Sequence, residues 1–145
     1  MEKDLKKLYW QMVLPALILL FVAEGAKEYG MLPIVRFSGF RAVEITFFVL
    51  GAAFAIALPI FYRMWFVNRV KEQKRISGQE FIQYQKNTLL IVLVSPFVAV
   101  AASVLSFSRM YYFGIILFAL YGCYYYFPSQ KRMAFEKKIF RIKEE

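Results

Sequence analysis

The stretch Arg63–Thr88, RMWFVNRVKEQKRISGQEFIQYQKNT, is the one long polar and basic segment between apolar runs of this chain. Its centre, Ser77–Glu80, matches a capping box, in which the serine hydroxyl accepts from the N3 amide and the N3 glutamate reaches back to the cap amide. Ile76 before the cap and Phe81 after it are placed to form a hydrophobic staple. The stretch therefore predicts a helical hairpin, with one helix ending close to Arg75 and the next beginning near residue 78.

The apolar runs around this segment are long enough to cross a membrane. Four uncharged runs stand out, at Leu8–Ala23, Ile45–Tyr62, Asn87–Ser108 and Met110–Gln130. A span needs about 20 mostly apolar residues, and in lipid such a run becomes a helix because its backbone polar groups must pair internally. We expect an all-α integral membrane protein, a four-transmembrane-helix bundle with an extended cytosolic or matrix helical hairpin between helices 2 and 3. The expected spans of this single domain, residues 1–145, are about 8–24, 43–65, 87–106 and 110–127, with the hairpin at 63–88 and a basic amphipathic tail at 129–145.

The composition is typical of a membrane protein and indicates which classes of partner it contacts. Apolar residues make up 60% of the chain and the net charge is +9, whereas a soluble domain is about 45–50% apolar. The basic residues cluster between the apolar runs, which indicates contact with lipid headgroups rather than with nucleic acid. We therefore expect anionic membrane lipids as partners, and no nucleic acid.

The distribution of Lys and Arg predicts the topology. The N-terminal tail, the hairpin and the C-terminal tail carry three, six and six of them, whereas the first loop has three (Lys27, Arg36 and Arg41) and the turn after the third run has only Arg109. The positive-inside rule places the richer segments, and with them both termini, on the cytosolic or matrix side. A bacterial plasma membrane and an organelle inner membrane both fit.

Residues that carry catalysis are largely missing from the sequence. The chain has no histidine and a single cysteine, Cys123, inside an apolar run, so disulfide, zinc and histidine-ligated haem sites lose their ligands. No nucleotide-binding, nucleophile-elbow or zinc-protease motif occurs. The sequence therefore predicts a protein that is not an enzyme and that binds no cofactor or metal.

Two acidic residues lie close to the predicted spans. Glu24 ends the first span and Glu44 begins the second, with Lys27, Arg36 and Arg41 near them in the sequence. Ionisable groups inside membranes often mark ion pathways, so these residues are candidates for an outer vestibule. The favoured interpretation is that they are interfacial residues paired with the neighbouring basic side chains.

Small residues recur at helical spacing in the second and third runs. Gly51 and Ala55 are four residues apart, and Ser95, Ala99 and Ser103 continue the same spacing. Such stripes let helix backbones approach closely. We expect them to pack spans two and three antiparallel, although the same stripes could serve a homodimer.

Two further surfaces are candidates for contact with a partner or with lipid headgroups. The hairpin arms carry apolar residues that can pack together, namely Phe66, Val67, Val70 and Ile76 against Phe81, Ile82 and Tyr84. In the tail, Phe135, Ile139 and Ile142 fall at i, i+4 and i+7 among six basic residues, a pattern suited to an anionic surface or to a partner protein. The hairpin adds the basic candidates Arg69, Lys71, Lys74 and Arg75.

The expected function is that of a non-catalytic integral membrane subunit, scaffold or assembly factor of a larger membrane protein complex. The alternative is a small homo-oligomeric channel or transporter with an outer vestibule at Glu24 and Glu44. The two differ in one prediction: a transporter loses function on Glu24→Gln or Glu44→Gln, whereas a scaffold is indifferent to these changes.

Overall fold

The chain folds into long helical rods. The structure is a computed structural model that describes residues 2–31, 40–73 and 76–142, and no strand occurs in these ranges. The helical segments are α1 (Glu2–Glu28), α2 (Arg41–Ala52), the π-helical η1 (Ala53–Ala57), α3 (Leu58–Val70), α4 (Gly78–Val92), α5 (Ser95–Val104), α6 (Arg109–Tyr125) and α7 (Gln130–Ile139). Three rods, α1, α2–η1–α3 and α4–α5, are long and apolar enough to cross a membrane, and there are up to four if α6 and α7, which meet at 73°, count as one bent span.

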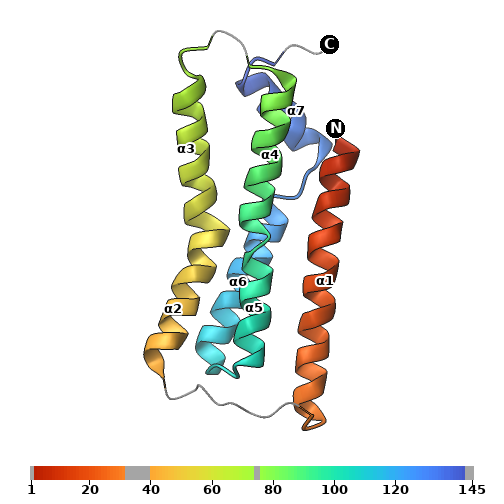
Figure 1. Ribbon diagram of the computed structural model, residues 1–145, viewed down its shortest axis with the longest axis vertical. Coiled ribbons are helices and arrows are strands. Elements are labelled where there is room, and N and C mark those ends of the chain that lie inside the picture. Colours follow the sequence, from red (N-terminus) through yellow and green to blue (C-terminus); the bar gives the residue numbers. More distant parts are fainter. Residues whose placement is uncertain (1, 32–39, 74–75, 143–145) are drawn as a thin grey trace.

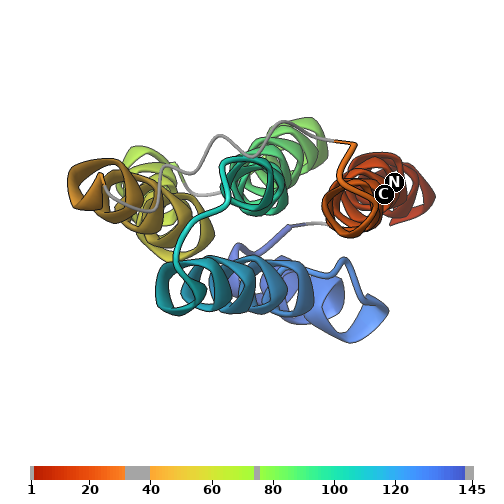
Figure 2. The same ribbon diagram turned by 90° about the horizontal axis from the view of Figure 1, so that it is seen from below.

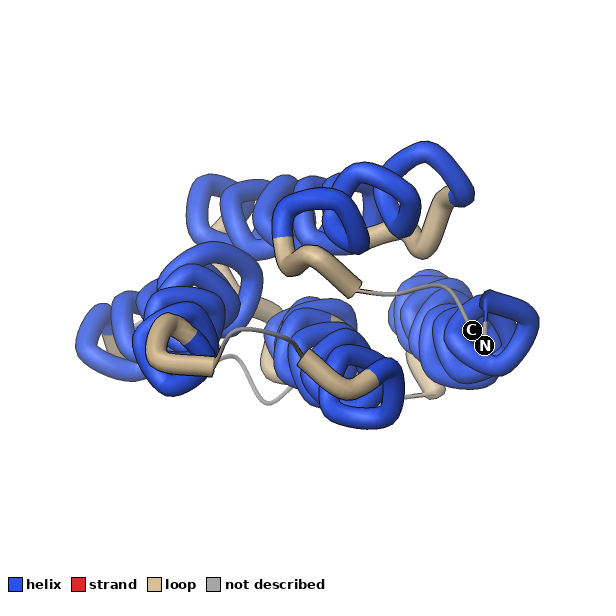
Figure 3. The backbone as a smooth tube through the Cα atoms, turned by 90° about the horizontal axis from the view of Figure 1, so that it is seen from above, coloured by secondary structure: helices blue, strands red, loops and turns tan. Residues whose placement is uncertain are grey.

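The rods form two layers. The α4–α5 rod lies between α1 and α2–η1–α3 in one layer, and α6 packs across one face of it (Figure 2). The view from the opposite end, in Figure 3, shows the same arrangement. The start of α1, the end of α3, the start of α4 and all of α7 lie at one end, which we name the hairpin end (Figure 1). The end of α1, the start of α2 and the turn between α5 and α6 lie at the other, the loop end.

A proline explains the π-helical turn in the second rod. The N–H of Leu58 donates to the carbonyl of Ala53, five residues back, instead of four. In a regular α-helix the ring of Pro59 would collide with the carbonyl of Ala55, and the wider turn relieves this collision. The rod therefore continues through Pro59 to Val70 as one candidate span.

The hairpin follows the predicted capping pattern with two corrections. As predicted, α4 begins at Gly78 with Ser77 as its N-cap, but the serine hydroxyl accepts from the N2 amide of Gln79, at 3.4 Å, and not from the N3 amide. The preceding helix ends at Val70 and not close to Arg75, a residue outside the described ranges. No apolar residue occurs between Val70 and Ile76, so a further helical turn there would bury nothing, and packing is what stabilises most helices.

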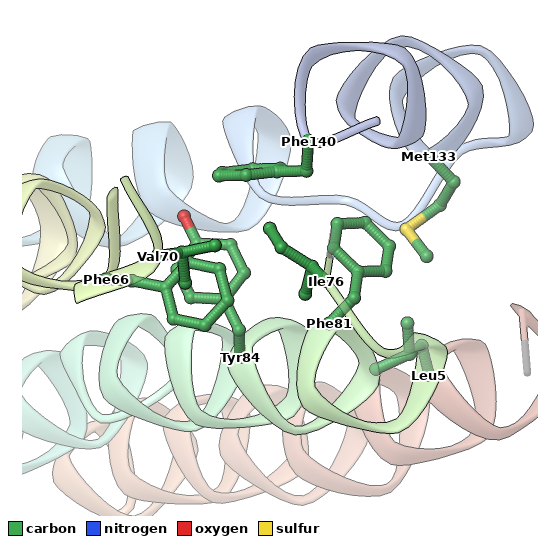
Figure 4. Packing of buried hydrophobic residues seen from close by; sticks show 8 residues of the cluster. All are labelled: Leu5, Phe66, Val70, Ile76, Phe81, Tyr84, Met133 and Phe140. Atoms are coloured by element: carbon green, nitrogen blue, oxygen red, sulfur yellow. The ribbon is translucent and has the colours of Figure 1, made fainter. Parts of the chain in front are cut away.

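The hairpin arms pack together and share one core with the N- and C-terminal segments (Figure 4). Phe66 and Tyr84 stack with ring centroids 4.2 Å apart, and Phe140 of the tail meets both rings edge-on. Two predicted members of the arms depart from this core, because Val67 is 41% exposed and Ile82 is only half-buried. The buried members of this hairpin core are Leu5, Phe66, Val70, Ile76, Phe81, Tyr84, Met133 and Phe140.

Candidate functional site

At the loop end, Glu24 joins three helices. Its Oε1 accepts a hydrogen bond from the Ser103 hydroxyl of α5 at 2.5 Å and from the Tyr112 hydroxyl of α6 at 2.7 Å. Lys27, one turn further along α1, lies 3.3 Å from the same oxygen and also donates to Ser103 Oγ at 3.1 Å. The predicted pairing of this glutamate with a neighbouring basic residue is thus present, and the carboxylate also connects α1 to α5 and α6.

Glu44 is fully buried and has a different kind of partner. Only 2% of the residue is exposed, and its Oε1 accepts from the backbone N–H of Ser108 at 2.6 Å. Ser108 is the N-cap of α6, where a carboxylate interacts favourably with the free N–H groups and the positive end of the helix dipole. Glu44 therefore holds the start of α6 against α2, and this backbone contact replaces the basic side-chain partner that the sequence predicted.

The remaining residues of the predicted vestibule do not join these carboxylates among the described residues. Arg41 is exposed and forms no ion pair within the described ranges, and Arg36 lies outside them. Glu24 and Glu44 have separate sets of partners. Each of the two carboxylates forms hydrogen bonds that connect its own helix to another.

The small-residue stripes lie at the centre of the bundle. The predicted positions Gly51, Ala55, Ser95, Ala99 and Ser103 are all buried. A Cβ on Gly51 would lie 3.6 Å from Ile115 of α6, so this stripe faces α6 as well as α5.

Two glycines of α6 that sequence reasoning missed complete this packing. A Cβ on Gly122 would lie 2.9 Å from Val92 and 3.4 Å from Ser95 Oγ, so a glycine is needed for α6 to approach the α4–α5 rod. Gly114 similarly makes room for the ring of Phe48. Their eight-residue spacing, with each glycine directly after an aromatic residue, is the sequence signal that could have identified them.

At the hairpin end, α7 packs on the core with a face that the sequence did not single out. Met133 and Phe140 are buried in the hairpin core, together with the charged Glu136. Phe135 and Ile139 remain exposed, at 64% and 46%, and Ile142 is half-buried against the hairpin core.

A buried polar network explains why a glutamate is tolerated on the docked face of α7. Glu136 is 5% exposed and Gln85 of α4 is 6% exposed, and the Gln85 amide donates to the Glu136 carboxylate. Arg132 Nε lies 3.4 Å from the other carboxylate oxygen. A buried charge is stable only when it is paired and hydrogen-bonded, so this network couples α7 to α4.

The predicted headgroup and partner contacts of the hairpin divide into two groups. Arg69 and Lys71 are exposed, and the Arg69 guanidinium lies 5.5 Å from the ring centroid of Trp65, in cation–π geometry. Lys74 and Arg75 lie outside the described residues.

Several hollows lined by described residues lie at the hairpin end. One of about 460 Å³ lies between α3 and α4, beside Trp65 and Arg69. A second, of about 370 Å³, separates the tip of the hairpin from the end of α7. A third, of about 430 Å³, lies where α3, α6 and α7 meet. Their sizes fall within the range of about 300–1,000 Å³ that small-ligand sites occupy.

Among the described residues, no group of three or more His, Cys, Asp or Glu side chains could hold a metal ion. Cys123 is half-buried, and its carbonyl accepts from the Tyr9 hydroxyl of α1 at 3.1 Å. Comparison of the chain with protein-family models, with curated proteins and with solved structures finds no match.

Proposed function

We propose that this chain is a non-catalytic integral membrane protein that serves as a subunit, scaffold or assembly factor of a larger membrane protein complex. The observation that carries the proposal is the head at the hairpin end, formed by the end of α3, the start of α4 and α7. This head has its own aromatic core at the hairpin end of the rods, to which Leu5 of α1 also contributes (Figure 4). A preorganised surface of this kind binds a partner with little ordering cost.

Of three buried clusters in the described structure, the hairpin core and the core at the loop end differ in side-chain size, and this contrast supports a membrane boundary between them. The hairpin core is built from large side chains, among them Phe66, Phe81 and Phe140. The core at the loop end contains three buried alanines, at 99, 102 and 119, beside Phe107 and Ile115. Burial of large apolar groups is strongly favourable in water, whereas helices in lipid associate through close packing of small residues.

The outward faces of the rods also favour a lipid environment. Large apolar side chains along α1 and along α2 and α3 are exposed, for example Phe21 at 74% and Phe61 at 65%. A soluble monomer rarely exposes apolar patches of more than a few hundred Å². Lipid, or further protein in the membrane, would cover these faces.

The head offers an exposed aromatic site for a partner. Trp65 is 53% exposed, lines the hollow between α3 and α4 and lies beside Arg69. Tryptophan and arginine are enriched among the residues that dominate the binding energy of protein interfaces.

The test is mild-detergent extraction from native membranes, sizing on a native gel and mass spectrometry of co-migrating chains. We expect the protein at a stoichiometric ratio in a larger assembly, and we expect Trp65→Ala to release it from that assembly. Trp10→Ala is the matched control, because Trp10 is also about half exposed, at 48%, but lies on α1. Recovery of the wild-type chain alone, or equal release by both variants, would count against the proposal.

The channel or transporter alternative makes the opposite prediction at the loop end. It requires Glu24 to exchange its bonds to Ser103 and Tyr112 for a transported ion. Under the proposed function, Glu24→Gln leaves assembly and complex activity within about twofold, because the amide oxygen still accepts from both hydroxyls. A stably folded Glu24→Gln protein with abolished ion flux would favour the alternative.

A further inference from the structure

The hollow between α3, α6 and α7 is lined by three cations. Arg63 belongs to α3, and Lys131 and Arg132 belong to the first turn of α7. Its volume is about 430 Å³, and Glu136 is the one carboxylate among the described residues that line it. The lining therefore carries more positive than negative charge.

The carboxylate at this hollow is already engaged inside the protein. Glu136 is 5% exposed and is bound by Gln85 and by Arg132 Nε. Neither Arg63 nor Lys131 forms an ion pair with any residue in the described ranges. Like charges gathered at one hollow repel each other unless an anion lies among them, and Glu136 offsets only one of the three positive charges.

Arg132 is held in position for such an anion. Its Nη1 donates to the carbonyl of Tyr125 at 3.2 Å, and its guanidinium carbon lies 4.8 Å from the ring centroid of Tyr126. These contacts and the bond to Glu136 fix the side chain, while a guanidinium has five N–H donors in total. The planar fork of an arginine matches the geometry of a phosphate.

The beginning of α7 adds to the positive potential. Ser129, the N-cap of α7, lines the hollow, and its hydroxyl accepts from the backbone N–H of Arg132 at 3.3 Å. The N-terminus of a helix presents free N–H groups and the positive end of the helix dipole. The start of α7 therefore adds to the positive potential that the three cations produce in the hollow.

The level of the hollow along the rods indicates where the anion comes from. Arg63 directly follows the apolar run Ile45–Tyr62, and Lys131 directly follows the run Met110–Gln130. Where these runs cross a bilayer, residues just beyond them lie among the lipid headgroups. The rings of Tyr125 and Phe135 also line the hollow and can contact the less polar part of a lipid.

We propose that this hollow binds the phosphate group of an anionic ligand, supplied by a phospholipid headgroup or by a soluble phosphate. Arg63, Lys131 and Arg132 bind its oxygens, and Glu136 positions Arg132. The placement of the hollow favours the lipid, and this part rests on the membrane insertion assumed under the proposed function.

The test uses the full chain purified in a neutral detergent and titrated with dioctanoyl phosphatidylglycerol, dioctanoyl phosphatidylcholine or inorganic phosphate. Binding is measured by calorimetry, and bound lipid is counted by native mass spectrometry. We expect saturable binding of phosphatidylglycerol that the double variant Arg63→Gln, Lys131→Gln weakens by about tenfold or more, because charge-assisted hydrogen bonds are lost. Neither residue has an ion-pair partner among the described ranges, so the fold should persist, which circular dichroism checks.

The matched control is the double variant Lys3→Gln, Lys7→Gln, which removes the same charge from exposed positions of α1 at the same end. It should bind phosphatidylglycerol like the wild type. Equal losses in the two double variants, no loss in either, or equally tight binding of phosphatidylcholine would overturn the site. Inorganic phosphate that binds as tightly as phosphatidylglycerol, with the same dependence on Arg63 and Lys131, would support the site and identify a soluble source.

Membrane retention is measured separately, so that the two proposals can fail independently. The wild-type chain should stay in native membranes after an alkaline carbonate wash. Retention without phosphate binding overturns the hollow alone, whereas release into the wash contradicts the membrane part of the proposed function.

Discussion

At the residue scale, the buried carboxylate of Glu44 caps the N-terminus of α6. The free N–H groups at the start of α6 need acceptors, and the Ser108 side chain does not supply one in the described structure. Glu44 accepts from the Ser108 N–H at 2.6 Å although it belongs to α2. Since only 2% of Glu44 is exposed, its charge depends on this contact and on the helix dipole.

We therefore predict that Glu44→Ala lowers the free energy of unfolding by about 1.5–3 kcal/mol, the typical contribution of a hydrogen bond to a charged group. Reversible denaturation in mixed detergent micelles measures this change. Glu28→Ala, at an exposed position of the same end, should stay within about 0.5 kcal/mol of the wild type. Equal effects of the two substitutions would show that the buried contact contributes nothing to stability.

Residue partners of this kind could be predicted only in part from the sequence. The pairing of Glu24 with Lys27 was predictable because the two are three positions apart on one helix. The partners Ser103 and Tyr112 are 79 and 88 positions from Glu24, and Ser108 is 64 positions from Glu44. No local sequence pattern identifies partners so far apart in the chain, because their contact depends on how the rods pack.

At the scale of elements, the start of α4 was more predictable than the end of α3 or the docked face of α7. The start of α4 follows from the Ser77 cap because capping is a local interaction. In the tail, the spacing of Phe135, Ile139 and Ile142 indicated a face for lipid or a partner protein, but it did not indicate the face that docks on the hairpin core. The docked face contains Glu136, which appears polar in the sequence and is compatible with burial only because Gln85 lies opposite it.

The docking of α7 predicts unequal effects for two phenylalanines of the tail. Phe140 is 8% exposed, and its ring contacts those of Phe66 and Tyr84, whereas Phe135 is 64% exposed. We expect Phe140→Ala to destabilise the head by about 3 kcal/mol or more and to speed trypsin cleavage after the exposed Lys138. Phe135→Ala should leave the cleavage rate unchanged, and equal rates for the two variants would contradict the docking.

At the scale of the whole molecule, the segments that are richest in Lys and Arg lie at the same end of the structure. The three segments richest in Lys and Arg are the N-terminal tail, the hairpin and the C-terminal tail. The start of α1, the start of α4 and α7 all lie at the hairpin end (Figure 1). If the rods span a bilayer, the chain crosses it an even number of times, because the start of its first described helix and all of its last one lie at the same end. The shortest crossing is α6, whose 17 residues are at the lower limit of about 17–25 residues for a span.

This arrangement predicts which positions share a side of the membrane. In a Cys123→Ser background, single cysteines introduced at the exposed positions Lys3, Gln79 and Lys138 should react with a membrane-impermeant maleimide from one side of sealed vesicles. Cysteines at Tyr29 and Met110, which are 80% and 81% exposed at the loop end, should react from the other side. Labelling of Lys3→Cys and Lys138→Cys from opposite sides would mean an odd number of crossings. In that case α6 would not cross the bilayer, and Lys131 and Arg132, which follow it, would lie away from the headgroups that surround Arg63.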